Sequence, residues 1–84
     1  MDAYYLTFQS MTQTQTAAAA LQEHGFAATP LRAPKAISVS GCGYAVQLWP
    51  SDVYGALFVL RSKGVSPRRV FRIGSNGEAK EEFL

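Results

Sequence analysis

The sequence lacks the features that identify a disulfide-rich, membrane-spanning or secreted protein. It has one cysteine among 84 residues, so no disulfide forms within the chain and a disulfide-stapled secreted domain is excluded. No apolar run approaches the roughly 18 residues of a membrane span. The first residues lack the basic and apolar regions of a signal peptide. These absences predict a soluble cytoplasmic protein that spans no membrane and whose thiol stays reduced.

Residues that carry chemistry are also few. One cysteine and one histidine do not supply the four ligands of a typical zinc site, and neither paired carboxylates nor a Ser-His-Asp set is evident. We therefore expect no metal and no cofactor. Eight Lys and Arg against six Asp and Glu give a net charge of +2, too small to indicate nucleic-acid binding by itself. A chain of this length builds only a thin core, so a homodimer is one way to add stability.

What the sequence does have is a regular succession of short elements. Alternating apolar residues predict strands, and apolar residues at helical spacing predict helices. Ser10 fits the N-cap of a first helix, and Gly25 fits the position after its end. Pro30 interrupts the second strand, which favours an edge of the sheet. The expected elements are strands at residues 3–8, 26–32, 43–49 and 68–73, a first helix ending near residue 24, and a second helix at residues 52–63.

The order βαββαβ predicts an α+β, ferredoxin-like fold. In that arrangement an antiparallel four-stranded sheet has the strand order 4-1-3-2, and both helices lie on one face. Residues 1–77 are expected to form a single domain, and residues 78–84 a short, acidic, frayed tail. Residues 33–41 form an unusually long connection, and long loops in compact domains often carry function.

The one cysteine, Cys42, lies between two glycines where this connection meets the third strand. Small neighbours expose a thiol and let another molecule approach it, whereas a structural cysteine more often has bulky apolar neighbours. The predicted topology brings this point beside the N-terminus of the first helix and the start of the fourth strand. The expected supporting residues are Gly41, Gly43, Ser38, Ser40, Ser10, Lys35, Arg68 and Arg69.

These surroundings have a chemical consequence for the thiol. Cationic side chains and a helix N-terminus favour a thiolate over a thiol. We therefore expect the pKa of Cys42 to lie below the value of about 8.5 found for a free cysteine. The only histidine, His24, falls at the end of the first helix, where we expect it to interact with the helix dipole. That end is remote from Cys42, so a Cys–His dyad is not expected.

Residues 34–48, which read PKAISVSGCGYAVQL, are similar to the pattern of a known family. The pattern is Pro-Arg-x-Ile-Ser-x-x-Cys-Gly-x-Ala-x-x-Phe, from a small bacterial family of selenium/sulfur carrier-like proteins that was once a domain of unknown function (DUF3343). The flanking elements extend the likeness over nearly the whole chain. The chain departs from the pattern at Lys35, where the family usually has arginine, at the extra Gly41, and at Gln47, where arginine is common.

The resemblance implies that Cys42 holds a persulfide or selenopersulfide and relays it between proteins, from a desulfurase-like donor to an acceptor. A carrier needs an exposed thiolate and a docking surface but no general base, so we expect a carrier rather than an enzyme. Two other interpretations stay open. One is a ferredoxin-like protein-interaction or regulatory module with an incidental cysteine, and the other is a thiol enzyme or redox sensor.

Two surface features have alternatives of their own. Five basic residues fall within twelve positions, which fits a dock for an acidic partner, a nucleic-acid stripe or a charged edge strand. Residues on the open face of the sheet fit ordinary strand packing best. They fit a partner or dimer interface better than RNA stacking, because the third strand lacks the signature of an RNA-recognition motif. The basic set is Arg61, Lys63, Arg68, Arg69 and Arg72, and the open-face set is Tyr5, Gln47, Trp49 and Phe71.

Overall fold

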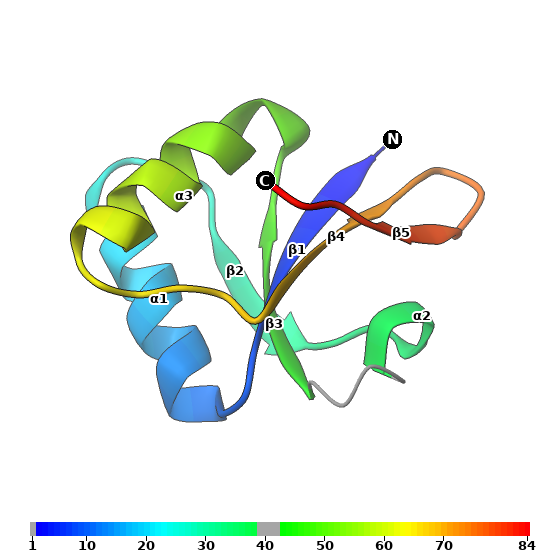
Figure 1. Ribbon diagram of the computed structural model, residues 1–84, viewed down its shortest axis with the longest axis horizontal. Coiled ribbons are helices and arrows are strands. Elements are labelled where there is room, and N and C mark those ends of the chain that lie inside the picture. The colour runs from blue at the N-terminus through cyan, green and yellow to red at the C-terminus, as the bar shows by residue number, and fades with distance from the viewer. Residues whose placement is uncertain (1, 39–42) are drawn as a thin grey trace.

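The computed structural model describes residues 2–38 and 43–84 of the chain. Figure 1 shows how the elements follow one another from the N-terminus to the C-terminus. No helix among these residues is both long and apolar enough to cross a membrane. The elements are β1 (Ala3–Phe8), α1 (Met11–Glu23), β2 (Thr29–Arg32), α2 (Lys35–Ser38), β3 (Tyr44–Leu48), the 3-10 helix η1 (Pro50–Asp52), α3 (Val53–Ser62), β4 (Arg69–Ile73) and β5 (Ala79–Glu81).

The strands form one antiparallel sheet in the order β2-β3-β1-β4-β5. β1 pairs with β3 and β4, and β2 pairs with β3, so these four strands have the neighbours that the βαββαβ order predicts. Pro30 lies on β2, at one edge of the sheet, as expected. The expected count of four strands and the order 4-1-3-2 are wrong, because β5 pairs with β4 and takes the other edge.

β5 comes from residues 78–84, which the sequence predicts to be a frayed tail. Its three residues, Ala79–Glu81, have no apolar alternation of their own, so nothing local indicates a strand. The strand exists because a tight turn returns the chain along β4. In that turn Gly77 has a φ of 81°, and its N–H donates to the Gly74 carbonyl at 2.9 Å. Pairing across the sheet therefore decides the structure of this segment.

The two long helices, α1 and α3, cover one face of the sheet, as the sequence predicts (Figure 1). Alternation along β1 directs Leu6 and Phe8 to this face, where both are buried. Leu21 of α1 and Leu57 and Leu60 of α3 are buried in the same cluster. The main core is therefore a single layer of apolar side chains between the sheet and the two helices.

The ends of α1 follow from local sequence alone. Ser10 caps the helix, because its Oγ accepts a hydrogen bond from the Gln13 N–H at 3.1 Å. At the other end Gly25 has a φ of 85°, and the Phe26 N–H donates to the Leu21 carbonyl at 3.0 Å. Both expected helix boundaries are confirmed. They also orient α1, whose N-terminus lies next to the end of β1.

The connection between β2 and β3 contains a helical turn, α2, that the sequence reading did not expect. The N–H groups of Ile37 and Ser38 donate to the Pro34 carbonyl at 3.0 and 2.9 Å. Ile37 is fully buried against Ala45 and Phe71. Its helix, α2, lies on the face of the sheet opposite α1 and α3 (Figure 1). One apolar side chain thus anchors a turn too short to be recognised by helical periodicity.

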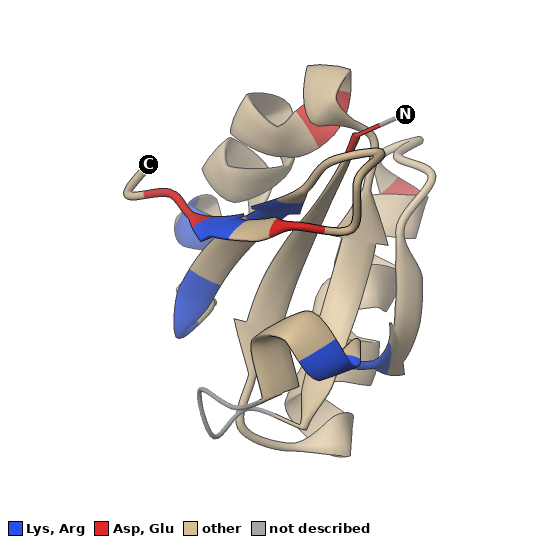
Figure 2. Ribbon diagram, turned by 90° about the vertical axis from the view of Figure 1, so that its right-hand side faces the viewer, with Lys and Arg blue, Asp and Glu red and all other residues tan. Residues whose placement is uncertain are grey.

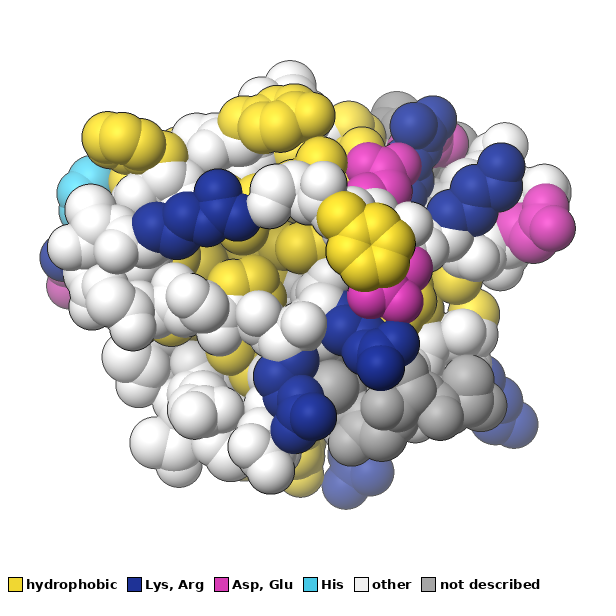
Figure 3. All heavy atoms as spheres, viewed as in Figure 1, with side chains coloured by type: hydrophobic (Ala, Val, Ile, Leu, Met, Phe, Trp, Pro, Cys, Tyr) yellow, Lys and Arg dark blue, Asp and Glu magenta, His cyan; other side chains and the backbone are white. Residues whose placement is uncertain are grey.

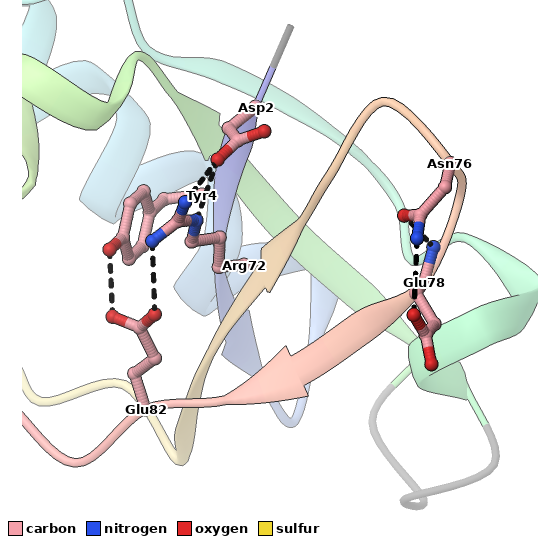
Figure 4. Close-up of polar contacts among 6 residues, drawn as sticks. All are labelled: Asp2, Tyr4, Arg72, Asn76, Glu78 and Glu82. Atoms are coloured by element: carbon pink, nitrogen blue, oxygen red, sulfur yellow. Dashed lines mark hydrogen bonds and ion pairs between the residues drawn. The ribbon is translucent and has the colours of Figure 1, made fainter.

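β5 and the residue after it are held by polar contacts as well as by strand pairing (Figure 4). The Tyr4 hydroxyl donates to Glu82 Oε1 at 2.7 Å, and the Glu82 N–H donates to the Val70 carbonyl at 2.8 Å. Arg72 lies between two carboxylates, with Nε 2.7 Å from Asp2 Oδ2 and Nη1 3.8 Å from Glu82 Oε2. The two ends of the chain are thereby tied to β4.

The Tyr4–Glu82 contact predicts a pH dependence of stability. The hydrogen bond to Glu82, followed by burial, raises the pKa of Tyr4, since both disfavour a phenolate. The hydrogen bond therefore contributes fully to the unfolding free energy below the unperturbed tyrosine pKa of about 10. This contribution is lost as the pH rises toward the raised pKa of Tyr4. We expect the difference in unfolding free energy between the wild type and Tyr4→Phe to be constant from about pH 8 to pH 10 and to shrink above pH 10.

Urea unfolding at a series of pH values measures this difference. Tyr54→Phe, at an exposed position on α3, is the matched control. Identical profiles for the two variants would contradict the prediction.

The anchoring of α2 predicts a second stability effect. Ile37→Ala removes a buried side chain and is expected to lower the unfolding free energy by about 2–5 kcal/mol, whereas Ile37→Val is expected to cost about 0.5–1.5 kcal/mol. Urea unfolding followed by circular dichroism measures both. If the alanine variant were as stable as the wild type, α2 would not be packed against the sheet.

Candidate functional site

The candidate site is the end of the sheet where β3 begins. Cys42, Ser40 and Gly41, which the sequence places at its centre, lie outside the described residues. The structure describes the chain on either side of them, up to Ser38 at the end of α2 and again from Gly43. Both of these flanking residues are exposed.

Pairing on both sides fixes the start of β3. Tyr44 lies opposite Phe8 of β1 and opposite Arg32 of β2. The Ala33 N–H donates to the Gly43 carbonyl at 3.0 Å, which continues the β2–β3 ladder by one bond. Gly43 is therefore held at the end of an interior strand.

The N-terminus of α1 lies at this same end, as expected, because β1 ends opposite Tyr44 and α1 follows directly. Ser10, a predicted supporting residue, is occupied with the helix itself. Its hydroxyl accepts from Gln13, and its carbonyl accepts from both the N–H and the hydroxyl of Thr14, at 3.1 and 2.9 Å. In this structure Ser10 therefore acts as a helix cap.

Two predicted supporting residues lie on α2. Lys35 begins the helix and is exposed, and the Ser38 hydroxyl donates to the Lys35 carbonyl at 3.3 Å. Burial of Ile37 attaches this turn to the sheet, so Lys35 and Ser38 stay near the start of β3. Sequence reasoning placed both residues in a loop and missed the helix that carries them.

Arg68 and Arg69 are brought to the end of β1, as the topology predicts, but their side chains differ. The Arg68 N–H donates to the Thr7 carbonyl at 2.8 Å, while its side chain is exposed and has no ion pair among the described residues. Arg69 Nη1 pairs with Glu81 Oε1 of β5 at 3.0 Å. The charge of Arg69 is thus largely offset by a strand that the sequence did not reveal.

The predicted basic cluster is likewise divided between paired and unpaired side chains. Arg61 Nη2 donates to the Leu84 main-chain oxygen at 2.6 Å, and Arg72 pairs with Asp2. β4 is not an edge strand, because β5 covers it, so the charged-edge interpretation does not apply. The described residues leave Arg32, Lys35 and Arg68 without an ion pair at the end of the sheet where β3 begins. Figure 2 shows the acidic segments in the opposite half of the molecule.

The open face of the sheet is less open than the sequence predicts. Phe71 is buried beneath Ile37, so its ring is not available for stacking. The Gln47 side-chain amide donates to the Tyr5 hydroxyl at 3.1 Å, so these two residues contact each other. Trp49 is exposed beyond the end of β3. An aromatic platform for RNA bases is therefore absent from the described part of this face.

His24 lies after the far end of α1, as expected from the sequence. It is exposed, and its Nδ1 is 3.0 Å from the Ala20 carbonyl oxygen. α1 begins beside the start of β3, so its 13 residues separate His24 from the candidate site. His24 therefore makes a local contact at the helix C-terminus.

A small hollow, here called the α1–β2 hollow, lies beside the start of β3 and is not indicated by any sequence motif. It has a volume of about 150 Å³ and lies between the first turns of α1 and the sheet. Its lining joins segments distant in sequence, so no local motif indicates it. The lining residues are Met11, Thr14, Gln15, Pro30, Leu31, Arg32 and Tyr44.

Comparison with known proteins gives a match to one family model. A family model described as "Putative Se/S carrier protein-like" matches residues 3–72. The match runs from the start of β1 into β4 and includes position 42. No curated protein and no solved structure matches the chain.

The two glycines at Gly43 and Gly25 are expected to respond differently to substitution. A Cβ at Gly43 would meet no described atom within 4 Å, and its φ is not positive, so Gly43→Ala should change the unfolding free energy by less than about 0.5 kcal/mol. Gly25 has a φ of 85°, so Gly25→Ala should cost about 1–2 kcal/mol. Urea unfolding compares them, and a large loss at Gly43 would show that this position needs glycine for folding.

Proposed function

We propose a carrier function for this chain, which belongs to the family described as "Putative Se/S carrier protein-like". In this proposal Cys42 holds sulfur or selenium as a persulfide or selenopersulfide and passes it from one protein to another. The family match carries the proposal, because it includes position 42 and the chain has no other cysteine. The proposed donor is a desulfurase-like protein, and the acceptor is a second protein.

The proposed transfer balances without an added oxidant or reductant. The Cys42 thiolate attacks the terminal sulfur of the donor persulfide, R–S–SH. A new S–S bond forms, the S–S bond of the donor breaks, and the donor cysteine leaves with the electron pair as a thiolate. An acceptor then repeats the same attack on the Cys42 persulfide, and Cys42 leaves as a thiolate. The selenium version differs only in the transferred atom.

The single cysteine suits this chemistry. A neighbouring cysteine would attack the inner sulfur of the persulfide, close a disulfide and release the terminal sulfur, which ends the relay. The chain has no second cysteine to do so. Unpaired Arg32, Lys35 and Arg68 favour the anionic thiolate and persulfide over their protonated forms. The single cysteine and these cations therefore support a persulfide carried on Cys42.

A protein-interaction module is the second candidate, and a specific observation favours it. Tyr54 and Phe58, one turn apart on α3, are 70% and 75% exposed. Figure 3 shows hydrophobic side chains at the surface over this helix. Exposed aromatic residues of this kind are typical of a surface that binds another protein. In this alternative Cys42 is incidental.

Transfer to Cys42 is tested by intact mass spectrometry. The wild type is incubated with a cysteine desulfurase and cysteine, and it is expected to gain the mass of one sulfur atom, which a thiol reductant removes. Cys42→Ala and Cys42→Ser are expected to gain nothing. Selenocysteine with a selenium-releasing lyase tests the heavier atom in the same way.

The contrary outcomes are equally definite. If the wild type gained no sulfur from several donors, or if Cys42→Ala gained as much, the carrier proposal would be wrong. Cells in which Cys42→Ala replaces the wild type without loss of function, while Phe58→Ser does cause a loss, would instead support the interaction module.

A further inference from the structure

The α1–β2 hollow has the size and lining of a subsite for one side chain. A cavity of about 150 Å³ is large enough for a benzene-sized group. Thr14 is buried at the hollow, and its hydroxyl is already used in a bond to the Ser10 carbonyl at 2.9 Å. Leu31 and Tyr44 are half-buried and lie on neighbouring strands. The lining thus offers mainly apolar surface to an incoming group.

Met11 makes this lining adaptable. It is the first residue of α1, and it is 49% exposed although it is large and apolar. Methionine is unbranched and polarizable, so it packs against partners of different shape and contacts aromatic rings favourably. An exposed methionine beside an apolar hollow is therefore suited to close over a bound side chain.

Arg32 is the one charged residue among the described lining of the hollow. It ends β2, lies opposite Tyr44, is exposed, and forms no ion pair within residues 2–38 and 43–84. A guanidinium presents a planar set of donors that matches a carboxylate. The hollow therefore combines an apolar subsite with a free carboxylate-binding group at the same place.

The surrounding charge has the same sign. Lys35 and Arg68 are also exposed and unpaired in the described structure, whereas Glu81 and Glu82 are already engaged by Arg69 and Arg72. The field at this end of the sheet is therefore positive even though the net charge of the chain is only +2. Such a field attracts an acidic surface and orients it before contact.

We infer that the α1–β2 hollow is a docking site for a protein that presents a bulky apolar side chain flanked by carboxylates. The apolar side chain enters the hollow beside Met11 and Tyr44, and a flanking carboxylate binds Arg32. The inference rests on the proposed function in one respect: the partner is identified as the persulfide donor only if the chain is a carrier. The docking contact itself uses no residue of the segment that contains Cys42.

A nucleic acid fits this surface less well. Binding a phosphate backbone needs a track of several cations, and Arg32 is the one cation in the described lining of the hollow. A short single-stranded oligonucleotide is therefore included in the test as the competing ligand.

Binding is tested with the full chain and a peptide of sequence Glu-Asp-Phe-Glu-Asp. Titration followed by amide chemical shifts is expected to perturb residues 11–15, 31, 32 and 44, and the binding is expected to weaken with added salt. A peptide with Ser for Phe, and one with Lys for every acidic residue, are the matched controls and are expected to bind at least tenfold more weakly. No binding, shifts elsewhere, or tighter binding of the oligonucleotide would overturn the inference.

Charge reversal locates the contact. Arg32→Glu is expected to weaken binding of the acidic peptide by about tenfold or more, because an attractive charge-assisted contact becomes repulsive. Lys80→Glu makes the same change of charge on β5, at the opposite edge of the sheet, and is expected to change the affinity less than about twofold. Amide spectra of both variants report whether they are folded. Equal affinities for the two variants would contradict a contact at Arg32.

Sulfur loading separates docking from chemistry. Arg32→Glu is expected to slow loading from a cysteine desulfurase at low donor concentration about tenfold more than it slows loading from a low-molecular-weight alkyl persulfide. Any effect on the Cys42 thiolate is common to both donors, whereas only the protein donor needs the docking surface. Equal rates from the desulfurase for Arg32→Glu and the wild type would overturn the docking site and leave the carrier proposal standing. No loading from either donor would refute the carrier proposal, and the peptide titration would then decide the docking site alone.

Discussion

The pairing of β1 with both β3 and β4 is the constraint on which the other features depend. β1 is interior in the sheet and buried on both faces, with Leu6 and Phe8 toward the long helices and Thr7 toward the other side. The Thr7 hydroxyl accepts from the Arg69 N–H at 3.1 Å and donates to the Arg69 carbonyl at 3.2 Å. Backbone pairing at the end of β1 places the starts of β3 and β4 beside it, and α1 begins soon after it, although the three starts lie far apart in the chain. The candidate site is the place where they meet.

The distribution of charge at that place differs from what a count of charges indicates. The acidic residues of the C-terminal segment bind the arginines of β4, which offsets the charge of Arg69 and Arg72. Arg32, Lys35 and Arg68 come from three separate segments and share one end of the sheet. Position, rather than net charge, therefore sets the electrostatic character of the site. In the proposals made above, this positive end favours an anionic sulfur and steers an acidic protein surface.

The sequence predicted the general location of the site but not its construction. It placed Gly43, Arg68 and the N-terminus of α1 at one end, because strand directions follow from the order of elements. It did not indicate that Arg69 would pair with Glu81. That pairing depends on β5, which lies beside β4 only in the folded chain. The α1–β2 hollow was also missed, since its walls come from α1, β2 and β3 and none of them is distinctive alone.

The sequence by itself determined the features that rest on neighbouring residues: the ends of α1 at Ser10 and Gly25, the alternation that makes the strands, and the pattern around position 42 that resembles the carrier family. Only the tertiary structure decided that two short segments, α2 and β5, form a helix and a strand. A single buried side chain, Ile37, makes α2 a helix, and pairing with β4 makes residues of the acidic C-terminal segment a strand. The physical reason is that a short segment gains too little from its own hydrogen bonds to offset its conformational entropy. Its structure is therefore settled by the surface against which it packs.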